Sequence, residues 1–210
     1  MSDELTQALA DLEEQKVETL VEERLAAGAD PSSILAASQE AMRQVGERYE
    51  AGEYFVSDLM MSSAIFKNVV ARLEPLLVGT VAVSRGSVVA GTVRGDVHDI
   101  GKDLVVSTLR ASGYTVTDLG VNVPAEQFVE ALKETGATLL ALSGLLTISF
   151  DPMKETVAAV EAAGLRSQVK IMLGGGPVTD QVLTYAGADA LGADPPSAVR
   201  LADKWMEAAR

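Results

Sequence analysis

The sequence predicts an α/β protein in two parts: an N-terminal small four-helix bundle, followed by a doubly wound domain built on a five-stranded parallel sheet. Two observations predict this division. Apolar side chains recur only at helical spacing up to about residue 78, and short β-branched runs alternate with helical stretches after it. A third observation, three loops of unusual composition after predicted strands, points to a site at one edge of the sheet.

The N-terminal part is predicted to be helical because leucine and valine recur every three to four residues between acidic ones. Asp30 followed by Pro31 marks a helix start, since aspartate caps a helix and proline suits its first position. Gly52 ends that helix. A further helix begins near Phe55 and ends near Pro75, so that about four helices form a small bundle.

The C-terminal part is predicted to alternate between strands and helices. Strands are expected at 87–93, 115–119, 138–143, 169–173 and 188–191, with helices starting near 101, 124, 151, 179 and 195. Such alternation implies a parallel sheet covered on both faces. Five units favour the flavodoxin-like strand order 2-1-3-4-5. We place a linker at 79–86, between a domain of residues 1–84 and a domain of residues 85–210.

Composition and charge argue against several classes of protein. The formal net charge of −13 disfavours a nucleic-acid backbone or an anionic membrane as partner, because both require clustered Lys and Arg. The first residues lack a signal-peptide pattern, and the longest apolar stretch, around 138–150, is too short to span a bilayer. The absence of cysteine rules out disulfides and thiolate metal sites. We therefore expect a cytoplasmic protein.

Three unusual loops are predicted to converge at the edge of the sheet where ligands bind in doubly wound folds, beyond the carboxyl ends of the strands. The loop after the first strand carries Asp96 and His98. The loop after the third strand comprises residues 143–149, and the loop after the fourth contains the run 174–176 of three glycines. This convergence predicts a ligand site at the switch between the first and third strands.

His98, the only histidine in the chain, lies two residues after Asp96. A carboxylate can hold the proton of one ring nitrogen and leave the other nitrogen free to bind a metal. The alternative is an imidazole that caps the following helix or fills a gap. The neighbouring aspartate and the position at the switch point favour a metal ligand, which must be the neutral imidazole.

Glycines and hydroxyls in these loops suit a bulky ligand but allow plainer roles. Gly101 permits close approach of backbone to ligand, or it simply begins a helix. The hydroxyls of Ser143, Thr147 and Ser149 satisfy backbone groups, or they bond to the ligand or to the Asp–His pair. The glycine run exceeds the needs of one turn, although such loops also cradle phosphates. No G-x-G-x-x-G follows the first strand, so the dinucleotide fingerprint is absent.

Together these motifs resemble a known family. Asp96-x-His98-x-x-Gly101, then Ser143-x-Leu145, then two adjacent glycines, resembles the signature of cobalamin-binding domains that hold the cofactor base-off with histidine on cobalt. Residues 46–76 resemble the helical cap that precedes this domain in methionine synthase and in stand-alone corrinoid proteins. The resemblance covers nearly the whole chain and implies a helical cap domain over 1–84 and a cobalamin (B12)-binding domain over 85–210.

The resemblance implies a role for each site residue. His98 is the expected lower axial ligand to cobalt, in place of the cofactor's own dimethylbenzimidazole, with Asp96 as its hydrogen-bond partner and Ser149 as the end of a proton relay. The other expected cofactor contacts are Asp99, Ile100, Gly101, Ser143, Leu145, Thr147, Gly174 and Gly175 around the corrin and its nucleotide tail, and Phe55 and Leu59 on the cap surface over the methyl-bearing face. Phe55 and Leu59 are also typical of an ordinary helical core.

The function implied is that of a methyl carrier, not catalytic alone, in a multi-component methyltransferase system. A donor-specific methyltransferase would methylate Co(I), and a second methyltransferase would take the methyl group from methyl-Co(III) to an acceptor such as tetrahydrofolate or a thiol. Cobalamin, as methylcobalamin or hydroxocobalamin, is the expected cofactor, and a reductive activator is a further candidate partner. His98 would release and rebind cobalt during the cycle, with residues 79–86 as the hinge of the cap.

Other classes of protein share parts of this pattern. A cobalamin-dependent light or ligand sensor has the same domain and a helical cap, but it usually carries an output domain. A radical mutase subunit usually lacks the cap. A flavodoxin-like domain that binds no corrinoid would require all of the motifs to be coincidental. These alternatives stay open from sequence alone.

Overall fold

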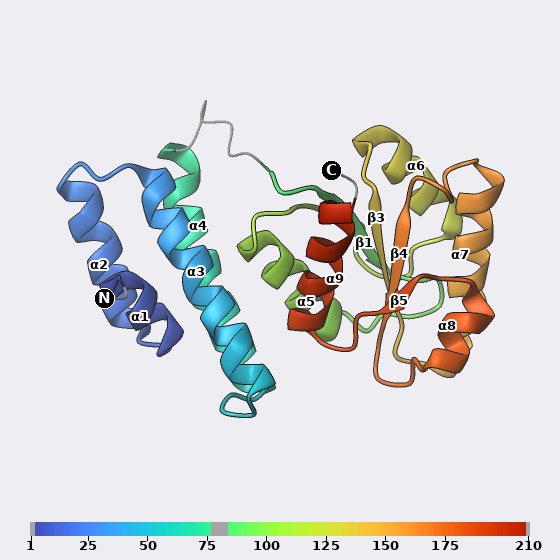
Figure 1. Cartoon of the computed structure of the whole chain (residues 1–210), viewed down its shortest axis with the longest axis horizontal. Helices are drawn as coiled ribbons and strands as arrows, with labels where there is room; N and C mark the ends of the chain where they lie inside the picture. The colour runs from blue at the N-terminus through green and yellow to red at the C-terminus, as the bar shows by residue number, and fades with distance from the viewer. Residues whose placement is uncertain (1–2, 77–83, 209–210) are drawn as a thin grey trace. The chain divides into compact units, whose positions relative to one another are not determined.

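The computed structural model describes residues 3–76 and 84–208, which divide into two compact units. One unit comprises residues 3–76 and 111–113, and the other comprises 84–110 and 114–208 (Figure 1). The linker expected at 79–86 falls mostly on residues that lie outside the described ranges.

The helical unit contains the predicted small bundle. Its elements are α1 (Glu4–Ala10), α2 (Glu14–Ala26), α3 (Pro31–Glu50), α4 (Val56–Leu73) and the short 3-10 helix η1 (Glu74–Leu76). The Asp30 carboxylate accepts the Ser32 N–H at 3.0 Å and Pro31 occupies the first position of α3, as the capping pattern predicts. Gly52 follows α3 with a φ of +76°. The apolar spacing runs on through Leu12, but a φ of +62° there separates α1 from α2.

The α/β unit is a five-stranded, all-parallel sheet in the order β2-β1-β3-β4-β5, which confirms the predicted fold class. The strands are β1 (Ser87–Thr92), β2 (Thr115–Asp118), β3 (Leu139–Ser143), β4 (Lys170–Gly174) and β5 (Ala190–Leu191). The helices are α5 (Ile100–Ala111), α6 (Ala125–Thr135), α7 (Phe150–Ala162), α8 (Asp180–Ala186) and α9 (Pro195–Ala208), with a 3-10 turn η2 (Thr147–Ser149) before α7.

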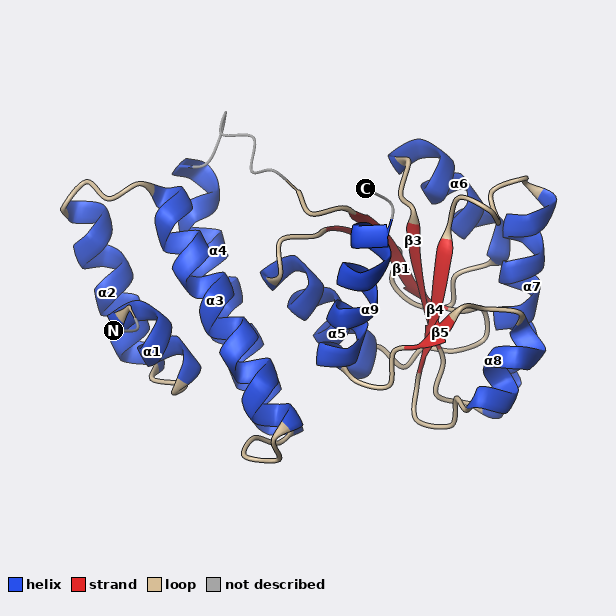
Figure 2. Ribbon diagram, viewed as in Figure 1, coloured by secondary structure: helices blue, strands red, loops and turns tan. Residues whose placement is uncertain are grey.

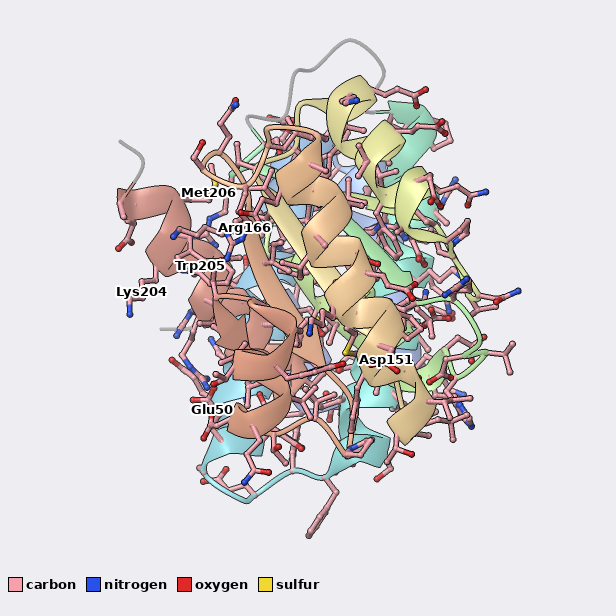
Figure 3. The ribbon with its side chains drawn as sticks, turned by 90° about the vertical axis from the view of Figure 1, so that its right-hand side faces the viewer. Glu50, Asp151, Arg166, Lys204, Trp205 and Met206 are labelled. Atoms are coloured by element: carbon pink, nitrogen blue, oxygen red, sulfur yellow. The ribbon has the colours of Figure 1, made fainter. Side chains whose placement is uncertain are left out.

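Helices cover both faces of this sheet, α6, α7 and α8 on one side and α5 and α9 on the other (Figure 2). The alternation of side chains along β1 divides the core accordingly. Val89 packs into the layer beneath α6, α7 and α8, whereas Val88 and Ala90 pack into the layer beneath α5 and α9. Trp205 and Met206, near the end of α9, pack against this second layer (Figure 3).

Helix α7 begins at the carboxyl edge of the sheet, directly after the loop that follows β3. The Tyr185 hydroxyl of α8 donates to the Asp151 carboxylate in the first turn of α7 at 2.6 Å, which joins these two helices. None of the helices in residues 3–76 and 84–208 is long and apolar enough to cross a membrane.

Candidate functional site

The loops after β1, β3 and β4 lie together at the carboxyl edge of the sheet. The Asp96 carboxylate, in the first loop, accepts the Leu145 N–H of the second at 2.6 Å. The Gly144 N–H, also in the second loop, donates to the Gly174 carbonyl at the end of β4 at 3.1 Å. The strand order thus brings all three unusual loops to one place, as expected for a parallel sheet.

Asp96 is the centre of this site, because its fully buried carboxylate accepts five hydrogen bonds from two loops. One oxygen accepts the His98 backbone N–H at 3.0 Å and contacts the His98 Nδ1 at 2.7 Å. The other accepts the N–H groups of Leu145 at 2.6 Å and Leu146 at 3.2 Å, and the Ser149 hydroxyl at 2.7 Å. A single carboxylate therefore joins the histidine loop to the loop after β3.

These hydrogen bonds keep Asp96 ionised. Burial alone acts to raise the pKa of the carboxyl, but the hydrogen bonds from the His98 N–H, the Ser149 hydroxyl and the His98 ring outweigh it and hold the pKa well below its usual range. An ionised carboxylate only accepts hydrogen bonds, so the proton shared with the ring belongs on Nδ1 of His98. In the neutral imidazole the other ring nitrogen, Nε2, then carries a lone pair, on a side chain that is 47% exposed.

The backbone of the histidine loop is fixed from the sheet. The Thr92 side chain, fully buried at the end of β1, donates its hydroxyl proton to the His98 carbonyl at 3.0 Å. Gly95 has a φ of +82°, a left-handed conformation that favours glycine. The Thr92 hydroxyl thus fixes the His98 carbonyl to the end of β1, and Gly95 allows the turn between them. The backbone that carries the imidazole is therefore fixed.

Gly101 lies in the first turn of α5 and has no reason within the described chain to be glycine. Its φ is not left-handed, and a Cβ built there would meet nothing within 4 Å. A helical glycine is less stable than alanine by about 1 kcal/mol. The open space next to His98 therefore fits a ligand that approaches the backbone of α5 closely.

Glycines after β3 and β4 allow two backbones to touch. A Cβ on Gly175, whose φ is +133°, would lie 1.9 Å from the Gly144 carbonyl oxygen, and a Cβ on Gly174 would lie 3.2 Å from the Gly192 carbonyl oxygen. A Cβ on Gly144 would lie 2.6 Å from the Ser149 Cβ. Two of the predicted glycines thus have packing reasons of their own. Gly144 was missed from sequence, although it lies inside the Ser143-x-Leu145 motif.

The loops after β1, β2 and β3 and the first residue of α5 carry exposed apolar side chains, which we call the apolar rim and which were not predicted as a group. Large apolar side chains exposed to water on several neighbouring loops indicate a surface that binds an apolar ligand or partner. Their exposed fractions are 66% for Val97, 66% for Ile100, 38% for Val121, 45% for Leu145, 39% for Leu146 and 66% for Ile148. The sequence feature that could have predicted this surface is the presence of apolar residues in loops that are otherwise polar or glycine-rich.

The other predicted contacts lie in both units. Ser143 ends β3 in register with Gly174, and Thr147 begins η2 at the surface. Asp99 is exposed, unlike Asp96. In the helical unit, Phe55 precedes α4 and is exposed, whereas Leu59 is a buried residue of that helix; their contact with a cofactor stays a prediction.

The residues fit a corrin cofactor. A corrinoid brings its cobalt already bound in its ring, so the protein would need to supply only one nitrogen ligand. His98 offers such a nitrogen, Gly101 leaves room beside it, and the apolar rim matches the edge of a large macrocycle. The fold and the site together define a corrinoid-binding α/β protein with a helical domain.

The comparisons agree with this class. The B12 binding domain family matches residues 86–199, and a second B12 binding domain family matches residues 1–74. The chain therefore belongs to the B12-binding family of corrinoid proteins, and cobalamin is its cofactor.

Relatives and solved structures match nearly the whole chain. The dimethylamine corrinoid protein of Methanosarcina barkeri is 38% identical, over 97% of this chain and 98% of its own. A crystal structure of a cobalamin-binding protein from Desulfitobacterium hafniense is 36% identical, with a TM-score of 0.77 and 96% of each chain covered. The methanol:cobalamin methyltransferase complex MtaBC of Methanosarcina barkeri contains a chain 28% identical, with a TM-score of 0.85 and coverage of 97% of this chain and 78% of that one.

Proposed function

We propose that this protein is the methyl-carrier subunit of a methyltransferase system and that His98 is the lower axial ligand of its cobalt. The observation that carries the proposal is the buried, ionised Asp96, which holds the proton on Nδ1 of His98 and leaves Nε2 free beside open space. The bound corrinoid supplies a cobalt atom that accepts and donates a methyl group.

The chain's own residues hold, orient and tune the imidazole. Asp96 fixes the tautomer and raises the basicity of the free nitrogen, and Ser149 donates to the opposite carboxylate oxygen. A proton that leaves or enters the His98 ring at Nδ1 would do so along this line of contacts. The open space at Gly101 and the exposed Ile100 support these two residues as contacts that would hold the corrinoid.

The partners we propose are a donor-specific methyltransferase and an acceptor methyltransferase, with a reductive activator as a third. The relatives support methylated amines and methanol as the first donors to test, since one is a dimethylamine corrinoid protein and one belongs to a methanol:cobalamin methyltransferase complex. Tetrahydrofolate or a thiol is the acceptor class we propose. The helical unit is proposed as the cap, with the exposed Phe55 as the first of its residues to test for contact with the cofactor.

Methyl transfer from labelled donors tests this function. The cobalamin-loaded, reduced protein is incubated with methyltransferases for trimethylamine, dimethylamine or methanol, each with its ¹³C-methyl substrate. We expect label to remain with the protein–corrinoid fraction after gel filtration for at least one donor. The His98→Ala protein, loaded with as much cobalamin as it will bind, is the control, and we compare the label retained per bound cobalamin in the two proteins. No label from any of the three donors, with cobalamin still bound, would count against a carrier for this group of donors.

Replacing Gly101 with alanine separates the needs of the ligand from those of the fold. We expect Gly101→Ala to stabilise the apoprotein by roughly 0.5–1 kcal/mol, because alanine is the better helix former. The same change should weaken cobalamin affinity at least tenfold, because the new methyl group enters the space proposed for the corrin. Urea unfolding of the apoprotein and a cobalamin titration measure the two effects. Ser107→Ala, further along α5, should leave cobalamin affinity unchanged, and equal affinity for Gly101→Ala and wild type would contradict the proposed placement.

A further inference from the structure

The loop after β2 is a second support for the histidine loop. Its Asn122 side-chain oxygen accepts the Gly95 N–H at 2.8 Å, and its Asn122 backbone N–H donates to the Asp96 carbonyl at 2.9 Å. One residue further on, the Val123 N–H donates to the Thr92 carbonyl at 3.0 Å. Asn122 therefore binds both Asp96 and the residue before it, Gly95. Its loop follows β2, which lies on the opposite side of β1 from β3 and the Ser149 loop.

Asn122 meets two requirements at once. Its φ is +55°, a left-handed conformation that asparagine and aspartate tolerate better than other side chains, and its side chain must supply an acceptor for the Gly95 N–H. Glycine would meet the first requirement and not the second, while aspartate would meet both. Alanine would meet neither. Substitutions at position 122 can therefore separate the need for a left-handed backbone from the need for an acceptor for the Gly95 N–H.

The loop that carries Asn122 is itself anchored. Lys102, only 5% exposed in the first turns of α5, pairs with the Asp118 carboxylate at 2.7 Å at the end of β2. The other Asp118 oxygen accepts the Gly120 N–H at 3.0 Å. The loop after β2 is thus bonded to α5 at its start and to the histidine loop at its end. It therefore connects the two segments on either side of His98.

We propose that Asn122 is a positioning residue for cobalt ligation by His98, an inference that rests on the proposed function. Asp96 is held on its carboxylate by the loop after β3 and on its backbone by Asn122. These contacts together hold the carboxylate against both the His98 Nδ1 and the Leu145 N–H. Loss of the Asn122 side chain leaves the Gly95 N–H without its acceptor, so that residue 122 holds this loop only through its backbone N–H on the Asp96 carbonyl. The weaker hold lets the imidazole leave the direction that ligation requires.

Two variants of Asn122 and one distant variant test this. Asn122→Gly removes the acceptor, Asn122→Asp keeps it, and Thr135→Val removes a comparable side-chain acceptor for a backbone N–H, that of Ala137, in the turn before β3. In the apoprotein, amide hydrogen exchange of Leu145 and Leu146 reports whether Asp96 stays in place, since these amides bond to Asp96 and not to Asn122. In the loaded protein, the absorption spectrum of bound hydroxocobalamin reports the fraction with His98 on cobalt.

We expect Asn122→Gly to speed exchange of the Leu145 and Leu146 amides at least fivefold and to move the spectrum part of the way from wild type toward that of His98→Ala. Asn122→Asp and Thr135→Val should match wild type in both readouts. Unchanged exchange and an unchanged spectrum in Asn122→Gly, where wild type and His98→Ala differ, would overturn the positioning role. Identical spectra for wild type and His98→Ala would instead refute the proposed function, and the positioning role with it.

Discussion

Replacing Asp96 with asparagine is expected to lower the free energy of unfolding of the apoprotein by about 3 kcal/mol, because buried donors lose a charged acceptor. The carboxylate accepts five hydrogen bonds, and an asparagine side chain has one acceptor oxygen and one donor nitrogen. With its nitrogen toward Leu145 and Leu146, the amide would face two backbone N–H groups. With its nitrogen toward His98, it would face the His98 N–H and the Nδ1 proton.

The second arrangement also reverses the histidine tautomer. An amide N–H aimed at the His98 ring can be accommodated if Nδ1 becomes the acceptor and the proton moves to Nε2, the nitrogen needed for cobalt. Asp96→Asn is therefore expected to weaken cobalamin affinity by roughly 10–100-fold, the usual effect of losing the hydrogen-bond partner of a metal-binding histidine. Calorimetric titration of the folded variant with hydroxocobalamin measures this loss.

Asp99 provides a matched control within the same loop. It is exposed, and within residues 3–76 and 84–208 its carboxylate has no hydrogen-bond partner, so Asp99→Asn should change the free energy of unfolding by no more than about 0.5 kcal/mol. Urea unfolding of both apoprotein variants makes the comparison. If the two substitutions changed stability equally, the buried carboxylate would not be the link between the two loops.

Gly175→Ala is expected to destabilise the protein by about 3–4 kcal/mol, through overpacking and backbone strain together. Its Cβ would lie 1.9 Å from the Gly144 carbonyl oxygen, a backbone atom that can move only if the loop after β3 moves, and its φ of +133° is strained for any L side chain. Because Leu145 and Leu146 follow Gly144 directly, the displacement should reach the Asp96 contacts. Thermal unfolding and exchange of the Leu145 amide measure the two consequences.

The neighbouring glycine separates this effect from a general intolerance of side chains. A Cβ on Gly176 would lie 3.4 Å from the Leu145 Cδ1, the end of a flexible and partly exposed side chain, and its φ is not left-handed. Gly176→Ala should therefore change stability by no more than about 1 kcal/mol. A large loss of stability for Gly176→Ala and a small loss for Gly175→Ala would contradict the close contact between Gly175 and the Gly144 carbonyl.

Much of the fold could be predicted from the sequence because helix starts and the alternation of strands and helices depend on residues close together in the chain. Asp30-Pro31 caps a helix wherever it falls, and the strand order follows from alternating β and α units, which also place Asp96 and His98 at the sheet edge. The pair itself is encoded over three residues, so its contact needs no tertiary information. The break at Leu12 was not predicted, because an unusual backbone angle leaves the apolar spacing unchanged.

Features that depend on two loops meeting could not be predicted from sequence. The glycine run was interpreted as room for a ligand, but the need for glycine at Gly175 comes from the Gly144 carbonyl 31 residues earlier in the chain. Asn122 carried no signal, because its role depends on its own φ and on the turn at Gly95. The apolar rim likewise becomes a single surface only after the loops converge.

Cobalamin ligation by His98 is the central claim, and an absorption spectrum tests it most directly. Hydroxocobalamin is added to the purified apoprotein of wild type and of His98→Ala, excess cofactor is removed by gel filtration, and the spectrum and cobalt content of each protein fraction are recorded. We expect one cobalt per wild-type chain with a histidine-ligated spectrum, and in His98→Ala either a loss of cofactor or a spectrum without that ligand. Equal cobalt retention with identical spectra in the two proteins would contradict the account.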